Sequence, residues 1–397
     1  MARRSRRTKR KEYARPHRIL VVDDEPDLER LVRMRMRRDI RSGRFDLDFA
    51  RNGVEALEFL SSDKSHDVIL TDINMPRMDG LTLLEQIPGV DPDVRAVVVS
   101  AYGDMQNIRT AMNRGAFDFV TKPIDFKDLR LTIDRTLKNL EVWREALKSR
   151  DRLVAIENEL NVARRMQRSI LPRSFPESPR YEVYAHMRPA RAVAGDFYDV
   201  VGLERDSVGL AIADVSGKGV PAALFMMSSR TLMKGAAIGG TDPGGILGSV
   251  NTVLAEENTE LMFVTMLYAI FDSRTGGLVY ANGGHDAPIV LHPDGTTSVL
   301  PLTGGLSLGV VPDYQYDCRT ARLAEGDIVL LYTDGVTEAQ NDRAEQFGED
   351  RIRQTLEGAR PGNAKEAIEV VFNAITEFSG TVPQFDDVTC VALRRLG

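Results

Sequence analysis

Acidic residues end several short apolar runs in the first part of this 397-residue chain. Asp23 and Asp24 close the run RILVVDD, and Asp72 closes DVILTD. Ser100 ends AVVVS, and Lys122 ends FDFVTK. Grouped carboxylates repel one another unless a divalent cation lies among them. A hydroxyl and an ammonium group beside them could contact phosphate oxygens. These residue types predict a phosphoryl-transfer pocket in which a carboxylate attacks phosphorus while a cation and Lys122 neutralise charge.

The second half of the chain carries acidic motifs of another kind. They are GDFYD with Asp196, ADVSGKG with Asp214, YTDGVTE with Asp334, and FDDVT with Asp386 and Asp387. Most of them adjoin strongly β-forming runs, so we expect them to gather at one sheet edge. Several carboxylates there could hold two hard cations, and a bridging water would become the nucleophile. No Ser-His-Asp or Cys-His arrangement is evident in the sequence, so the motifs predict a two-metal hydrolase.

The elements that must position the first set of residues alternate between two patterns. From about residue 18 to residue 123, runs rich in Val, Ile and Phe are too short for helices and indicate buried strands. Helical patterns lie between them, for example at 27–38, 54–60 and 104–114. Repeated βα units predict an α/β fold, a doubly wound five-stranded parallel sheet with ligands at the carboxyl ends of its strands.

The segment from Ile124 to Leu171 contains neither glycine nor proline and is dense in charge. A continuous helix of this length would extend roughly 70 Å. Its apolar positions recur at a spacing of seven and then shift register: Ile133, Leu140, Leu147, Val154, then Leu160, Ala163, Ile170. The stripe predicts a parallel coiled-coil homodimer. The alternative is two shorter helices that meet near 149–152 and pack on their own domains.

After Pro172 the pattern becomes α+β. Strands are expected at 207–214, 263–272, 278–281, 288–291, 327–332 and 388–393. Helices are expected at 221–234, 243–256 and 364–378.

The first set of motifs matches a known family. VVDDEP, DVILTDINMPRMDG, VVVSAYGD and FDFVTKPI, in this order, resemble the response-regulator receiver domains over about residues 18–140. The resemblance implies that Asp72 accepts a phosphoryl group from a histidine kinase. It also implies that Mg²⁺ is held by Asp23, Asp24 and the backbone carbonyl of Asn74.

The same resemblance assigns three further residues. Ser100 and Lys122 would contact the phosphoryl oxygens, and Phe119 takes the family's aromatic switch position. The peptide bond between Lys122 and Pro123 would be cis.

The second set of motifs resembles the PPM (type 2C) Ser/Thr phosphatases, most closely the bacterial sporulation and stress-response branch of partner-switching pathways. The match begins at ENELNVARRMQRSILP and continues through GGHDAP, LSLGV, AEGDIVLLYTDGVTEAQN and QFGEDR. It implies a β-sandwich flanked by helices and two Mn²⁺ or Mg²⁺ ions. The implied ligands are Asp196, Asp214, the carbonyl of Val215, Asp334 and Asp386, with Asp387 as the second choice of its pair.

The chain departs from the eukaryotic branch of that family beside Asp214. DVSGKG stands where that branch has DGHGG, so no adjacent histidine can act as general acid, and water would protonate the leaving oxygen. His285 is either a substitute acid or a loop histidine held by a backbone hydrogen bond. Arg188 or Arg191 could meet the substrate phosphate or form surface salt bridges.

Composition and charge place further bounds on the protein. The two cysteines have no metal-binding spacing, and no apolar run reaches the roughly 20 residues of a membrane span, so we expect a reduced, cytoplasmic protein without a membrane partner. The first eighteen residues hold nine Lys and Arg against the single Glu12. This tail is either a disordered solvated segment or an electrostatic arm. The expected division is a basic tail at 1–17, a receiver at 18–125, a helical connector at 126–171 and a phosphatase at 172–397.

These features predict a response regulator whose phosphorylation at Asp72 controls a metal-dependent protein Ser/Thr phosphatase. The branch resemblance implies a phosphorylated anti-sigma-factor antagonist as substrate. The alternative is a catalytically silent PPM-fold module that sequesters a partner under receiver control. No helix-turn-helix pattern follows the receiver, so a nucleic-acid partner is not expected.

Overall fold

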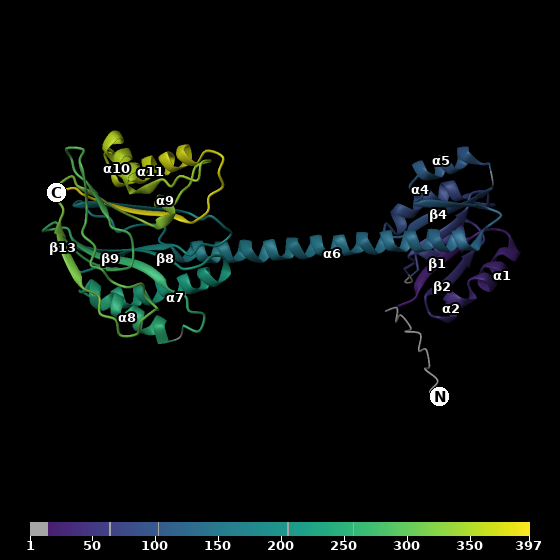
Figure 1. Cartoon of the computed structure of the whole chain (residues 1–397), viewed down its shortest axis with the longest axis horizontal. Coiled ribbons are helices and arrows are strands. Elements are labelled where there is room, and N and C mark those ends of the chain that lie inside the picture. Colours follow the sequence, from purple (N-terminus) through teal and green to yellow (C-terminus); the bar gives the residue numbers. More distant parts are fainter. Residues whose placement is uncertain (1–14, 63–64, 102, 205, 257) are drawn as a thin grey trace, which may run out of the picture. The chain divides into compact units, whose positions relative to one another are not determined.

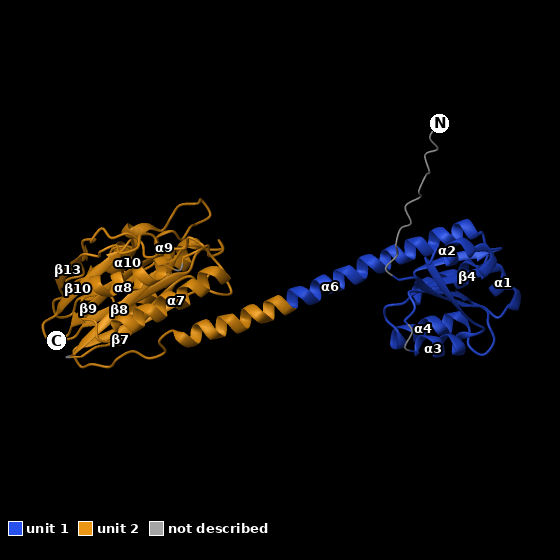
Figure 2. Cartoon of the chain, turned by 90° about the horizontal axis from the view of Figure 1, so that it is seen from below, with its two compact units in different colours: residues 1–154 blue, residues 155–397 orange. Residues whose placement is uncertain are grey.

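The computed structural model describes residues 15–62, 65–101, 103–204, 206–256 and 258–397. Residues 1–14 of the basic tail lie outside these ranges. The chain divides into two compact units, residues 1–154 and 155–397 (Figure 2). The predicted boundaries after residues 17, 125 and 171 stay predictions. In the described ranges, no helix combines the length and apolarity that crossing a membrane requires.

The first unit is built on a five-stranded parallel sheet, as the sequence predicted (Figure 1). Its strand order is β2-β1-β3-β4-β5. The strands are β1 (His17–Val22), β2 (Phe45–Ala50), β3 (Val68–Asp72), β4 (Arg95–Ala101) and β5 (Asp118–Lys122). Every residue of β3 is buried, which explains its continuous apolar run.

Helices cover both faces of this sheet. They are α1 (Pro26–Arg35), α2 (Arg37–Arg41), α3 (Gly53–Leu60), α4 (Gly80–Val90), α5 (Met105–Asn113) and the start of α6 (Phe126–Ile170). One core joins the sheet to α3, α4 and α5, and a second joins it to α1 and α6. Asn52 caps α3 through the amides of Val54 and Glu55, and Asp79 caps α4 through the amide of Thr82.

Helix α6 is continuous over 45 residues, so the alternative of two shorter helices is wrong. Its beginning packs on the first unit, where Ile133 and Leu140 are buried. The sequence stripe placed these two residues in an intermolecular seam, and that placement is wrong, because both are already buried within a single chain. Residues 148–159 are all exposed. Near its end, the side chains of Arg164 and Gln167 donate hydrogen bonds to the carbonyls of Ala192 and Ala194 in the second unit.

The second unit holds two five-stranded antiparallel sheets. One has the order β13-β10-β9-β8-β7 and the other β12-β11-β14-β15-β6. The strands are β6 (Tyr181–Arg188), β7 (Phe197–Gly202), β8 (Ser207–Val215), β9 (Val264–Asp272), β10 (Gly277–Gly283), β11 (Ile289–Leu291), β12 (Thr297–Val299), β13 (Cys318–Arg322), β14 (Ile328–Tyr332) and β15 (Val388–Arg395).

Helices flank this sandwich, as expected. They are α7 (Val220–Ala237), α8 (Pro243–Glu256), α9 (Asp334–Thr337), α10 (Gly348–Ala359) and α11 (Ala364–Ser379). Successive side chains of β14 point to opposite faces. Val329 and Leu331 join the core that links both sheets with α7 and α8, whereas Ile328 and Leu330 pack with α10 and α11. This double burial explains why β14 is apolar at every position.

Candidate functional site

The first candidate site lies at the carboxyl edge of the parallel sheet. Asp23, Asp24 and Asp72 each offer an oxygen, and these oxygens lie within 4.8 Å of one another. Asp23 and Asp72 are buried, and Asp24 is exposed. Hard oxygen ligands grouped in this way fit Mg²⁺. Topology explains the grouping, because β1 and β3 are adjacent parallel strands.

Lys122 joins this group from the end of β5. Its Nζ lies 2.7 Å from Oδ2 of Asp72 and 3.0 Å from Oδ2 of Asp23. Burial disfavours the ammonium charge, but the hydrogen bonds to Asp72 and Asp23 outweigh it and raise the pKa of Lys122 above its usual range. Burial also raises the pKa of Asp23. Lys122 therefore stays charged beside Asp72. The peptide bond to Pro123 is cis, as the resemblance implied.

The remaining predicted residues of this site surround Asp72 less closely. Ser100 is buried near the end of β4, and its Oγ has no hydrogen-bond partner among the described residues. An unsatisfied buried hydroxyl is costly, so this atom is suited to a ligand. Phe119 on β5 is 37% exposed, and Asn74 is exposed in the turn after β3. The roles of Asn74 and Phe119 stay predictions.

Gly80 is a residue of this site that the motif analysis did not single out. A Cβ at this position would lie 2.1 Å from the carbonyl oxygen of Asp72. The backbone after β3 turns back on itself here, since the amide of Gly80 donates to the carbonyl of Ile73. In the sequence, Gly80 could have been recognised as the glycine that ends the motif DVILTDINMPRMDG.

The second candidate site gathers acidic residues from the loop before β7, from β8 and from the start of α9. Asp196 precedes β7 and is 1% exposed, and its Oδ2 accepts hydrogen bonds from the hydroxyls of Thr333 (2.8 Å) and Thr389 (2.5 Å). Asp214 lies near the end of β8, and Asp334 begins α9. The structure thus brings together residues far apart in the chain.

Repulsion and burial perturb all three of these acids. Burial, then the charge of Asp214, raises the pKa of Asp196 well above its usual range. Burial and the nearby Asp334 raise the pKa of Asp214 to about 7. Burial, followed by the charges of Asp386 and other neighbouring acids, raises the pKa of Asp334 to about 6. Hard cations would relieve this repulsion, which fits a metal centre.

The backbone near Asp214 approaches the loop before Asp196 closely. A Cβ on Gly195 would lie 3.0 Å from the carbonyl oxygen of Val215 and 3.6 Å from Oδ1 of Asp214. The carbonyl of Val215, a predicted ligand, therefore faces the same space as the acids. Gly195 leaves that space open.

Asp386 and Asp387 have different environments although they are adjacent. The oxygens of Asp387 accept hydrogen bonds from the amides of Ala190 and Gly195, each at 2.7 Å. Oδ2 of Asp386 instead lies 2.7 Å from Nζ of Lys218, which sequence reasoning did not assign to the site. Asp387 is thus suited to holding the loop before Asp196, and Asp386 to binding a cation.

His285 is buried behind the site. Its Nδ1 lies 2.9 Å from the hydroxyl of Thr265, whose backbone pairs with Asp214. The side chain of Asn282 binds both the amide and the carbonyl of His285. Burial lowers the pKa of His285 to about 4. A neutral, buried imidazole fits the expected loop histidine held by hydrogen bonds better than a general acid.

Comparison with known proteins identifies both units. Residues 19–134 match the response regulator receiver domain, and residues 204–396 match the stage II sporulation protein E family. The chain joins a receiver domain to a PPM-type phosphatase domain. The first match contains the receiver motifs, and the second contains Asp214, Asp334 and Asp386.

Individual relatives match parts of this chain. Protein IcfG of Synechocystis is 31% identical over 266 residues, which cover 60% of this chain and 41% of IcfG. The phosphoserine phosphatase RsbU of Bacillus subtilis is 29% identical over 240 residues, 60% of this chain and 71% of RsbU. The SiaA-PP2C domain of Pseudomonas aeruginosa superposes with a TM-score of 0.53 and 26% identity, over 61% of this chain and 98% of that domain.

Proposed function

We propose that this protein is a response regulator in which phosphorylation of Asp72 by a histidine kinase controls a metal-dependent protein Ser/Thr phosphatase. The observation that carries the proposal is that one chain holds two acidic sites of different design. One is the trio of Asp23, Asp24 and Asp72 with Lys122, and the other surrounds Asp214.

In the receiver domain, Asp72 would attack the phosphorus atom of a phosphohistidine. Asp23, Asp24 and the carbonyl of Asn74 would hold Mg²⁺, which supplies charge neutralisation when bound. Lys122, already 2.7 Å from Asp72, would contact a phosphoryl oxygen, and the unpartnered hydroxyl of Ser100 would donate to another.

In the phosphatase domain, the candidate ligands would hold two Mn²⁺ or Mg²⁺ ions, which activate water for attack on phosphorus when bound. Asp214 interacts electrostatically with both Asp196 and Asp334, which favours it as the ligand that the two ions would share. Because His285 is buried and neutral, the leaving oxygen of phosphoserine or phosphothreonine would take its proton from water.

Helix α6 is proposed as the route of control and as the site of a parallel homodimer. Residues 148–159 are exposed over their whole circumference and include Leu153, Val154 and Ile156. A solvated helical segment gains most of its stability from a partner. Phosphorylation would change the pairing or register of this segment. The likeness to RsbU favours a phosphorylated anti-sigma-factor antagonist as substrate.

The test is hydrolysis of phenyl phosphate by the full chain with Mn²⁺, with and without a small phosphodonor. Asp214→Asn should abolish metal-dependent hydrolysis, and Asp72→Ala should abolish only the response to the donor. Activity that is indifferent to the donor in the wild type would contradict the control. No hydrolysis of either phenyl phosphate or phosphoserine peptides by metal-loaded protein would favour the silent binding module.

A further inference from the structure

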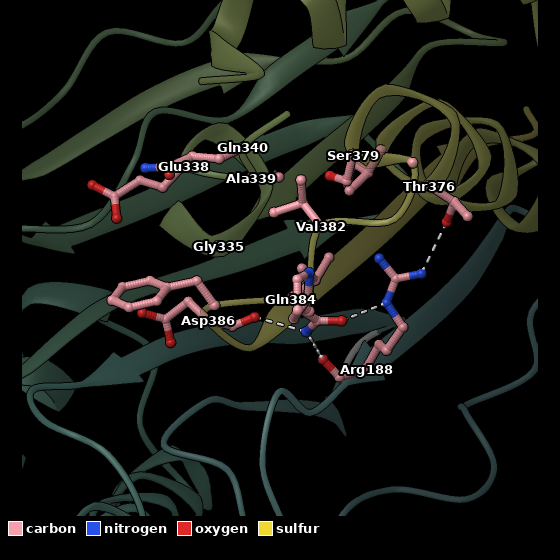
Figure 3. Close-up of a pocket in the computed structure, with 15 residues that line it drawn as sticks. Arg188, Gly335, Glu338, Ala339, Gln340, Thr376, Ser379, Val382, Gln384 and Asp386 are labelled. Carbon is pink, nitrogen blue, oxygen red and sulfur yellow. Dashed lines mark hydrogen bonds between the residues drawn. The ribbon is translucent and has the colours of Figure 1, made fainter. Parts of the chain in front are cut away.

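A pocket of about 380 Å³ opens beside the phosphatase acids (Figure 3). It lies between α9, the last turns of α11 and the loop that leads into β15. Asp386, a candidate metal ligand, is part of its wall, and Gly335 next to Asp334 is another part. Ile375, Val382 and Val388 contribute apolar surface. The pocket therefore shares Asp386 with the acidic site, and it is large enough for side chains of a polypeptide.

Arg188, the last residue of β6, contributes a positive charge to the wall of this pocket. Its Nε donates to Oε1 of Gln384 (2.8 Å), and its Nη1 donates to the hydroxyl of Thr376 (3.0 Å), as Figure 3 shows. Its guanidinium also lies 5.4 Å from the ring centroid of Phe372. All these partners are uncharged. Within the described ranges, Arg188 forms no ion pair with an acidic side chain, so the expectation of a surface salt bridge is not met.

A half-buried cation held only by neutral groups favours a carboxylate or phosphate partner. Burial lowers the pKa of Arg188, because the loss of solvent disfavours its charged form. The donors on Nη2 make no hydrogen bond among the described residues, so they can meet an incoming anion. The position beside Asp386, rather than among the acids, separates this anion from the phosphate that is hydrolysed.

Gln384 connects Arg188 to the acidic site. Its Nε2 donates to the carbonyls of both Arg188 and Asp386, each at 2.7 Å (Figure 3). Its Oε1 accepts from the guanidinium of Arg188. The side chain of Gln384 thus holds the guanidinium of Arg188 and the backbone of Asp386 in fixed relative positions.

We propose that this pocket binds the segment of the substrate protein that flanks the phosphorylated residue, and that Arg188 pairs with an Asp or Glu side chain in that segment. The inference rests on the proposed phosphatase activity and names a feature of its substrate. The charge of Arg188 selects the acidic side chain at its own side of the pocket, away from Glu338 (Figure 3), and the shared wall residue Asp386 places the segment near the scissile phosphate. An apolar neighbour of that residue would lie against Val382 and Ile375.

The test uses the full chain with Mn²⁺ and a set of phosphoserine peptides. Each peptide carries one Glu, or a matched Gln, at successive positions before and after the phosphoserine. The wild type should show a kcat/KM about tenfold higher for Glu than for Gln at one position, as a charge-assisted hydrogen bond provides. Arg188→Gln should bring this ratio close to one. Arg188→Glu should reverse it in favour of a peptide with Lys at the same position.

Lys365→Gln is the matched control, because Lys365 lies on α11 in an exposed pair with Glu369 and is not part of the pocket. It should retain the wild-type ratio. Ser379→Trp, which fills the pocket without touching the charge, should lower kcat/KM for the peptides about tenfold relative to phenyl phosphate. This variant still tests the role of the pocket if the Arg188 variants do not fold.

Three results would overturn the role of the pocket while leaving the proposed function intact. The first is an active wild type with no Glu preference at any position. The second is a Glu preference that survives both Arg188→Gln and Arg188→Glu. The third is peptide hydrolysis unaffected by Ser379→Trp. Failure of the wild type to hydrolyse both phenyl phosphate and every peptide would instead overturn the proposed function, and the pocket's role with it.

Discussion

Asp386 and Asp387 show how one residue type divides into two roles at adjacent positions. Asp387 is 8% exposed and accepts two backbone amides, whereas Asp386 faces Lys218 and the acids. The sequence FDDVT indicates an acidic site but favours Asp386 over Asp387 only through family resemblance. The partners that distinguish them, Ala190 and Gly195, lie nearly two hundred positions away in the chain, so the sequence around FDDVT gives no information about them.

Substitution of each aspartate by asparagine should separate metal binding from stability. Asp386→Asn should reduce Mn²⁺-dependent hydrolysis by about 100-fold or more, the effect of losing several kcal/mol of cation stabilisation. It should leave the melting temperature of the EDTA-treated chain nearly unchanged, because relief of the repulsion with Asp334 offsets the loss of the ion pair with Lys218. Asp387→Asn should lower the free energy of unfolding by about 2 kcal/mol, since the side-chain nitrogen of Asn cannot accept and one of the two backbone amides is left without its acceptor.

Circular dichroism melts with EDTA and hydrolysis assays with Mn²⁺ distinguish the two outcomes. Equal loss of stability in both metal-free variants would contradict the assignment of Asp387 to the loop before Asp196.

At the scale of elements, Asp67 links the start of β3 to β1 and α6. Its carboxylate is 2% exposed and accepts from the amide of Arg18 (3.0 Å) and from Nη1 of Arg144 (2.6 Å). Burial would raise the pKa of Asp67, but hydrogen bonds with His17, Arg144 and Arg18 outweigh it and hold the pKa well below its usual range. A depressed pKa stabilises the fold above the unfolded value of about 4, and this stability is lost as the pH falls below it.

Asp67→Asn should therefore cost about 3 kcal/mol at pH 7, since it leaves Arg144 without its buried partner. The cost should be smaller by about 1 kcal/mol at pH 3, where the unfolded wild type already binds the proton. Trp143, the single tryptophan, lies beside Arg95 on the first unit and reports its unfolding in urea by fluorescence. An equal cost at both pH values would argue against the charge of Asp67 as the source of stability.

Most elements with long apolar runs were predictable, whereas marginal elements and the buried strand β7 were not among the expected ones. Strands β3, β8 and β14 are apolar because packing demands it, and their bounds agree with expectation to within about a residue. Strand β13 (CRTAR) lies at a sheet edge and is almost wholly exposed, so it lacks an apolar pattern. Strand β12 has three residues, and α4 contains Pro88, which conceals a helical pattern.

The same reasoning explains what could be predicted of the sites. Asp72 and Asp214 stand at strand ends, where short motifs identify them. Thr333 and Thr389, which hold Asp196, contact it only through tertiary packing of β14 and β15 with the other sheet.

At the scale of the whole molecule, the single chain leaves one part of α6 without packing. Ile133 and Leu140 are buried within one chain, so of the predicted seam positions only Leu147 and those after it remain for an intermolecular contact. Val154 is 49% exposed there, and Val142, on the same helix but outside the predicted stripe, is 60% exposed. The two valines match in residue type and helix and are similar in exposure, and they differ in whether the predicted seam includes them.

Val154→Lys should therefore weaken self-association at least tenfold, because the seam would bury a charge in place of a valine side chain worth about 2 kcal/mol. Val142→Lys should leave the dissociation constant unchanged. Sedimentation equilibrium of the full chain over a range of concentrations measures both, and hydrolysis of phenyl phosphate with and without the phosphodonor should lose its donor response in the first variant only. A monomeric wild type, or equal weakening by both substitutions, would exclude α6 residues 148–159 as the dimer contact and would leave control to be carried within one chain.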